Sequence, residues 1–167
     1  MNKYYTFKRG TVVMVDFSPQ VGSEIKGKHF AIVLTKKDRN TNELLTVIPL
    51  TSKYHIYHID FGNEIYDSIY KKLMLSVEEV VKAYCNLDDD NKEKKNELTL
   101  QLEMCNQISD RYKLLKEQTY GKPHQITTIS KIRIVKPINR IDPIRKLQVS
   151  NEVMNKIDES IIALFTK

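Results

Sequence analysis

The sequence predicts a mainly β protein with added α-helices (α+β), in which a small antiparallel barrel carries an inserted helical hairpin and a C-terminal helix. Short apolar runs rich in β-branched residues, separated by polar turns, occupy residues 12–61 and return at 125–135. Between these regions lie two long stretches that contain no glycine or proline and have the periodicity of helices. A last helical pattern closes the chain.

Four strands are predicted in the N-terminal region, at residues 12–17, 30–35, 44–50 and 54–61. Along the first of them, Val13 and Val15 share one face and Val12 lies on the other. Pro49 has no N–H to donate, so the pairing of the third strand near this residue should be broken or lie at an edge.

Helices are predicted over residues 70–84 and 96–116, each with one apolar stripe. The polar run 87–92 joins them, which favours two antiparallel helices in an αα-hairpin. We expect residues 1–167 to form a single domain in which the segment 66–119 is the inserted hairpin.

The C-terminal part adds one strand and one helix. Residues 125–135 alternate in polarity and predict the strand, and Pro137 follows it. Ser150 is a suitable N-cap for the helix, whose buried stripe includes Val153 and Ile157.

Composition limits the class of protein. The 167 residues allow one substantial core, and 41% apolar with 29% charged residues is typical of a soluble globular domain. No apolar run is long enough to span a bilayer, and the first ten residues contain no apolar signal region, so we expect a cytoplasmic protein without membrane contact. Cys85 and Cys105 make neither a disulfide framework nor a zinc-ligand pattern.

The net charge of +6 is divided unevenly along the chain. Residues 1–62 contain nine Lys/Arg and five Asp/Glu, and residues 125–167 contain eight and four, so each end carries +4. Residues 63–124 contain ten basic and twelve acidic side chains and carry −2. A polyanion should therefore bind the two ends, folded together, rather than the middle.

The loop before the second predicted strand combines groups suited to chemistry on an anion. Glu24, Lys26 and Lys28 lie in a short loop with two glycines, and His29 stands where the loop meets the strand. A solvated loop would carry the same residues for solubility alone, so the residue types by themselves do not decide between the two interpretations.

No metal site and no cofactor are expected. His55 and His58 lie three residues apart on a predicted strand and would point to opposite faces, so they could not chelate together. The motifs of nucleotide-binding loops and of serine nucleophiles do not occur in the sequence.

Cleavage of RNA needs neither a metal nor an external nucleophile, because the 2′-hydroxyl of the substrate can attack the adjacent phosphorus. The protein must then supply a base, an acid and donors to the charged phosphorane. Glu24 or His29 could be the base or the acid. The donors could come from the end of the third strand, at Thr51, Ser52 and Lys53.

Several segments resemble the MazF/PemK family of toxin–antitoxin ribonucleases. The resemblance rests on Arg9-Gly10-Thr11-Val12, on DFSPQVGSE at residues 16–24 with Gly27, and on VIPLT at 47–51. Less firmly, ITTISKIRIV at 126–135 and the segment 150–165 match the family's later strand and closing helix. The segment 63–120 has no counterpart in the short members of the family.

The resemblance implies an SH3-like, MazF-like barrel, usually a homodimer, that cuts single-stranded RNA at short sequences without a metal. The products are a cyclic phosphate and a 5′-hydroxyl, and the loss of mRNA inhibits translation and growth. The disordered tail of a cognate antitoxin protein blocks the RNA groove in this family.

The resemblance also assigns residues. Glu24 and Thr51 match catalytic positions, and with His29 they form the predicted catalytic set. The residues predicted to contact RNA are Phe17, Ser18, Ser23, Lys26, Lys28, Ser52, Lys53, Ser130, Lys131 and Arg133.

One position departs from the family pattern. The family's catalytic arginine falls on His29, and the proline that follows it falls on Phe30. Histidine is not a permanent cation with a fork of donors. Three interpretations follow: His29 acts as the acid–base group, Lys26 or Lys28 supplies the cation, or the activity is weaker. We favour the first, because an imidazole is a competent acid–base group.

Two other functions stay open. A CcdB-like protein of the same fold would inhibit DNA gyrase without catalysis, and a barrel of this kind could bind RNA without cutting it. The acidic character of the insertion argues against an RNA-binding role for it. It would cover the antitoxin groove, alter dimerisation, or simply elaborate the barrel, and we favour the last.

Overall fold

The computed structural model of the protein describes residues 4–19, 21–87, 91–113 and 115–166. Its strands are β1 (Val12–Asp16), β2 (Lys28–Val33), β3 (Leu44–Thr51), β4 (Ile59–Asp60), β5 (Tyr120–Gly121) and β6 (Thr127–Ser130). Its helices are α1 (Glu64–Cys85), α2 (Lys92–Tyr112) and α3 (Asn151–Phe165), with short 3-10 helices η1 (Pro123–Gln125), η2 (Lys131–Arg133) and η3 (Pro143–Lys146).

The strands form one antiparallel sheet in the order β1-β2-β3-β5-β4, with β6 also paired to β3. Beyond the free edge of β1, single bridges from Val15 to Ile134 and from Thr11 to Gln148 replace a continuous ladder. The predicted α+β class with an antiparallel sheet is confirmed, and the fold is consistent with a MazF-like one. The barrel is not closed, however, because the segment after β6 meets β1 at isolated points only.

Both faces of the sheet are buried. Val13 and Val15 belong to one apolar cluster, whereas Val12 belongs to a second cluster that includes residues of all three helices. The alternation predicted for β1 is therefore confirmed, and each face of the strand supports its own core.

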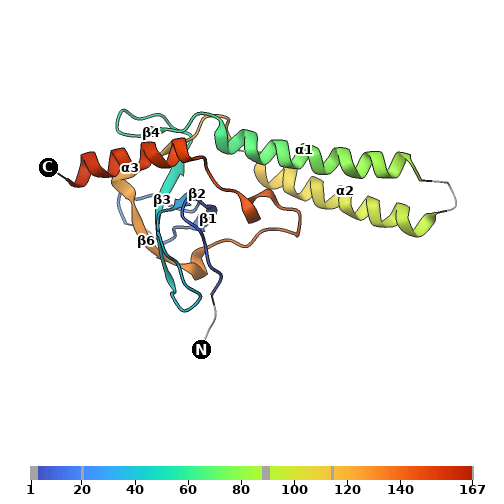
Figure 1. Ribbon diagram of the computed structural model, residues 1–167, viewed down its shortest axis with the longest axis horizontal. Helices are drawn as coiled ribbons and strands as arrows, with labels where there is room; N and C mark the ends of the chain where they lie inside the picture. Colours follow the sequence, from blue (N-terminus) through green and yellow to red (C-terminus); the bar gives the residue numbers. More distant parts are fainter. Residues whose placement is uncertain (1–3, 20, 88–90, 114, 167) are drawn as a thin grey trace.

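The helices α1 and α2 lie side by side and extend away from the sheet, while α3 lies on the other side of the molecule (Figure 1). Only the ends nearest the sheet enter its core, through residues such as Ile69 of α1 and Ile108 of α2. The predicted αα-hairpin is confirmed, and residues 88–90 of its expected connector lie outside the described residues. No helix in the described part of the chain is both long and apolar enough to cross a membrane.

The cap of the last helix is confirmed as well. Ser150 Oγ accepts a hydrogen bond from Val153 N at 3.3 Å. The same hydroxyl donates to Glu64 Oε2 at 2.6 Å, so the start of α3 is attached to the start of α1.

Two strand predictions were wrong in part. Of the strand predicted at 54–61, only β4 pairs, and the residues before it turn: His58 N donates to His55 O at 2.9 Å. The strand predicted at 125–135 ends at Ser130, which caps η2 instead. The extended backbone ends here because the side chain of Lys131 is buried beside Asp38.

Candidate functional site

A hollow of about 210 Å³ opens where β2 begins, β3 ends and α2 ends. The sheet contributes Lys28, His29, Thr51 and Ser52 to its lining, and the end of α2 with the residues that follow contributes Arg111 and Lys116. The hollow therefore joins two strands and the helical hairpin in one site.

Pro49 explains why the two strands separate here. The ladder between β2 and β3 ends at the pair Ala31–Pro49, as predicted from the missing N–H. Beyond this pair β2 continues only beside β1, down to Lys28, and β3 continues only beside β5, up to Thr51. The space left between the diverging strands is bordered by His29 and Thr51, two of the three side chains predicted from the sequence to act together.

The electrostatics of the hollow favour an anion. Three cationic side chains line it, from Lys28, Arg111 and Lys116, and no carboxylate stands among the described residues of the lining. Charge of one sign concentrated in a hollow raises the local concentration of the opposite charge. A phosphate is a suitable ligand for such a lining.

His29 is half-buried, and its Nε2 lies 2.8 Å from the backbone carbonyl of Lys26. A carbonyl can only accept, so the neutral imidazole must carry its hydrogen on Nε2. The lone pair is then on Nδ1. This tautomer gives the ring a base in its neutral form and a proton donor in its cationic form.

Thr51 closes the other side of the hollow. Its Oγ1 accepts a hydrogen bond from Lys53 N at 3.1 Å, which orients the hydroxyl. No acceptor for the hydroxyl hydrogen is in place among the residues that the structure describes. Thr51 can therefore donate to a ligand oxygen.

Glu24 does not join His29 and Thr51. It lies exposed on the loop before β2, and among the described residues its carboxylate accepts one long hydrogen bond, from Val21 N at 3.4 Å. Ile25, which is buried, anchors this loop to the core. Of the three residues expected to converge, the structure brings two together in the hollow and leaves the third outside it.

The loop nevertheless lies beside other residues predicted to contact RNA. Arg133 Nη1 donates to Ser18 O at 2.9 Å, and Gln125 Nε2 donates to Ser23 O at 3.2 Å. Among the residues of this loop and of the end of β3 that were predicted to contact RNA, five are exposed, namely Ser18, Ser23, Lys26, Ser52 and Lys53. Of these, Ser52 also lines the hollow.

Three of the predicted RNA contacts have a different place. Phe17 is fully buried in the core. The ammonium of Lys131 lies 2.8 Å from Asp38, with side-chain exposures of 3% and 1%, so it forms a buried ion pair. Ser130 pairs with Leu44, at the end of β3 opposite Thr51 and roughly 23 Å away along the strand. Phe17 and Lys131 have no exposed side chain to offer a nucleic acid.

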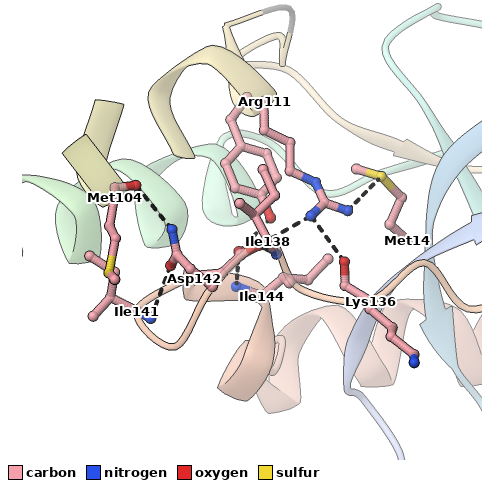
Figure 2. Close-up of polar contacts among 10 residues, drawn as sticks. Met14, Met104, Arg111, Lys136, Ile138, Ile141, Asp142 and Ile144 are labelled. Carbon is pink, nitrogen blue, oxygen red and sulfur yellow. Dashed lines mark hydrogen bonds and ion pairs between the residues drawn. The ribbon is translucent and has the colours of Figure 1, made fainter. Parts of the chain in front are cut away.

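Sequence reasoning missed Arg111 and the residues that hold it (Figure 2). Arg111 Nη1 donates to Lys136 O at 3.1 Å and to Asp142 Oδ2 at 3.3 Å, and Tyr112 Oη donates to Asp142 Oδ1 at 2.6 Å. Burial, followed by the bond to Asp142, raises the pKa of Tyr112 far above its ordinary value, so its hydroxyl stays protonated. Thirty residues separate the partners, and no local pattern signals such a contact.

The prediction that His55 and His58 point to opposite faces of a strand is wrong. Because the predicted strand is a turn, the rings of His55 and His58 lie on the same side, with centroids 5.2 Å apart. Burial lowers the pKa of His58 below its ordinary value, and the neighbouring His55 adds to this effect. Within the described residues, however, no three metal-ligating side chains are grouped to hold an ion.

Comparison with known proteins identifies one family. Residues 8–84 match the family described as PemK-like, MazF-like toxin of type II toxin-antitoxin system. This segment includes β1, β2, β3 and the loop between the first two, and it extends into α1. No curated protein matches the chain.

Proposed function

We propose that this chain, which over residues 8–84 belongs to the family of PemK-like, MazF-like toxins of type II toxin–antitoxin systems, is an endoribonuclease that cleaves single-stranded RNA. The observation that supports the proposal most is the cationic hollow in which His29 and Thr51 meet. Loss of mRNA would inhibit translation and growth, which is the effect of a toxin of this kind.

The attack on phosphorus and the stabilisation of the growing charge need only groups that border the hollow. The 2′-oxygen of the substrate attacks the adjacent phosphorus, the P–O5′ bond breaks, and a cyclic phosphate forms. His29 Nδ1 removes the proton of the 2′-hydroxyl, and Thr51 donates to a non-bridging oxygen as its charge grows. The leaving 5′-oxygen receives a proton from a second acid, so that protons balance.

We assign that second proton transfer to Glu24, which must carry a proton on its carboxyl group when it reaches the leaving oxygen. It precedes His29 by five residues, on the loop that leads into β2. The carboxylate stands outside the hollow, so this role requires the loop to fold over the bound strand.

The partners follow from the family. We propose that a cognate antitoxin protein covers the hollow, that the toxin acts as a homodimer, and that it works in the cytoplasm. We also keep the proposal that residues 66–119 are an insertion within one domain. Size-exclusion chromatography with light scattering on the full chain tests the dimer, which would have twice the 19.5 kDa of one chain.

The experiment that tests the proposed activity is cleavage of a labelled RNA in EDTA by the purified protein. His29→Ala and Thr51→Ala should each lower the rate by at least about a hundredfold. His124→Ala and Thr128→Ala change the same residue types outside the hollow and should leave the rate unchanged. Wild-type rates for both His29→Ala and Thr51→Ala would contradict the assignment of the site.

The same preparation separates the alternatives. A protein that binds RNA and releases no product would be an RNA-binding module and not a nuclease. A protein that leaves RNA intact and blocks DNA supercoiling by gyrase would instead act as a CcdB-like inhibitor. Either result would overturn the proposed function.

A further inference from the structure

The sheet alone supplies little positive charge to the hollow. Its contribution is Lys28, at the exposed first position of β2. The end of the hairpin contributes two further cations, Arg111 and Lys116, although the segment 63–124 as a whole is acidic. The charge that matters at the site is therefore local, and the negative sum over the segment was a misleading guide to it.

The guanidinium of Arg111 is held in place, but not all of its N–H donors have an acceptor among the described residues. Its side chain is 11% exposed and makes three donor contacts, to Lys136 O, to Asp142 and to the sulfur of Met14 at 3.5 Å (Figure 2). A guanidinium has five N–H groups. The Nε–H and one hydrogen of Nη2 have no acceptor among the described residues. Nη2 contacts Met14, and Met14 itself lines the hollow.

Asp142 orients Arg111 without saturating it. The contact involves one nitrogen and one oxygen at 3.3 Å, and not the two-point fork that arginine and carboxylate form when fully paired. The carboxylate is buried and also accepts from Tyr112 Oη, Ile138 N and Ile144 N. Four donors thus share the negative charge of Asp142, so Asp142 neutralises the guanidinium only in part. Arg111 can therefore also bind a second anion.

We infer that Arg111, carried by the hairpin, is the residue that neutralises the scissile phosphate of RNA in the hollow. The inference rests on the proposed function. It assigns a binding role to Arg111 and a positioning role to Asp142, and it makes the hairpin part of the site. Lys28 and Lys116 also line the hollow, but no hydrogen bond to a described residue fixes either ammonium, whereas Arg111 is held by Asp142 and Lys136 O and offers a planar fork of donors.

A purely structural role is the competing explanation. Arg111 would then only fasten α2 to the segment 136–142, and its loss would act through stability alone. Asn139 provides a matched control, because its side-chain amide donates to Met104 O at 3.1 Å and joins the same two segments without lining the hollow. Asn139→Ala should lower the melting temperature and leave the cleavage rate per folded molecule unchanged.

The test compares Arg111→Ala with the wild type and with Asn139→Ala at a temperature where all are folded. Arg111→Ala should lower kcat about a hundredfold or more, and millimolar guanidinium should restore part of that loss. Arg111→Lys should keep RNA affinity while losing most of kcat, because it keeps the charge but not the planar fork. If Arg111→Ala does not fold, Arg111→Lys with and without guanidinium carries the test.

Binding is measured in parallel with a fully 2′-O-methylated RNA, which cannot be cleaved through its 2′-oxygen. Weaker binding by Arg111→Ala, with a smaller dependence on salt, would support the inference even if the wild type cut no RNA and the proposed function failed. Wild-type binding and cleavage by a folded Arg111→Ala would overturn the inference and leave the proposed function intact. A loss of activity matched by Asn139→Ala and not restored by guanidinium would also overturn it.

Discussion

Tyr112 Oη lies 2.6 Å from Asp142 Oδ1, and this bond joins the last residue of α2 to the loop before η3. Both residues are buried, with exposures of 1% and 2%. Besides the apolar packing of the hairpin ends, this carboxylate and its donors therefore attach the end of α2 to the segment before η3. The same carboxylate orients Arg111, which couples the position of the hairpin to the lining of the hollow.

Asp142→Asn should lower the free energy of unfolding by about 3 kcal/mol, because it leaves the guanidinium of Arg111 without its buried counter-charge. Tyr112→Phe removes one neutral donor and should cost less, about 1 to 2 kcal/mol. Urea unfolding measures both. Tyr70→Phe is the control, since Tyr70 Oη makes only a long bond of 3.3 Å to Tyr112 O. Equal stability of Asp142→Asn and Tyr70→Phe would contradict this role of the carboxylate.

Lys131→Met should destabilise the fold by about 3 kcal/mol, because it leaves the buried carboxylate of Asp38 without its counter-charge, although the backbone N–H groups of Phe7 and Arg39 still donate to it. The double variant Lys131→Met with Asp38→Asn should recover part of the loss, which thermal unfolding would show. RNA affinity per folded molecule should not change. A fall in RNA affinity without a fall in stability would instead restore Lys131 as an RNA contact.

Gly121→Ala should destabilise by about 1 to 3 kcal/mol through overpacking. A Cβ at this position would lie 2.6 Å from Phe61 Cζ and 3.1 Å from Ile48 Cδ1. Gly62→Ala is a useful comparison, because it meets no atom within 4 Å but has a φ of +60°, so its cost of about 1 kcal/mol is conformational. The double variant Gly121→Ala with Phe61→Leu has a larger pocket and should therefore be more stable than Gly121→Ala alone. Adding Phe61→Leu to Gly62→Ala should bring no such gain.

The stability of the protein should fall as the pH drops from about 6.5 through the lowered pKa of His58. Burial disfavours the charged imidazole in the folded state, so the unfolded state binds the proton first. His58→Asn should therefore lose less melting temperature than the wild type between pH 7 and pH 5. The same decline in both proteins would show that other groups carry the acid sensitivity.

Local sequence patterns predicted the parts of the fold that local physics controls. The alternation of β1 assigned Val13 and Val12 to different faces, and the missing N–H of Pro49 predicted where its pairing stops. The cap of Ser150 followed from its side chain alone. In each case the deciding interaction lies within a few residues or on the neighbouring strand.

The rest depended on contacts between distant residues. Lys131 left its predicted strand because Asp38, far away in sequence, is buried beside it. Arg111 lines the hollow because α2 ends there. The net charge of −2 over residues 63–124 predicted no cation from this segment at the site. Glu24 was predicted to lie beside His29 and Thr51. It lies outside the hollow because the conformation of its loop, and not its distance from His29 in the sequence, places its side chain.

The end groups of the cleaved RNA test the central claim most directly. The protein is incubated in EDTA with an RNA oligonucleotide, and the products are identified by mass spectrometry. The same oligonucleotide with a 2′-O-methyl group at the cleaved position serves as the control. We predict a 2′,3′-cyclic phosphate and a 5′-hydroxyl from the first RNA and no cleavage at the methylated position. A 5′-phosphate product, cleavage at the methylated position, or intact RNA from a protein that arrests growth would contradict the proposed mechanism.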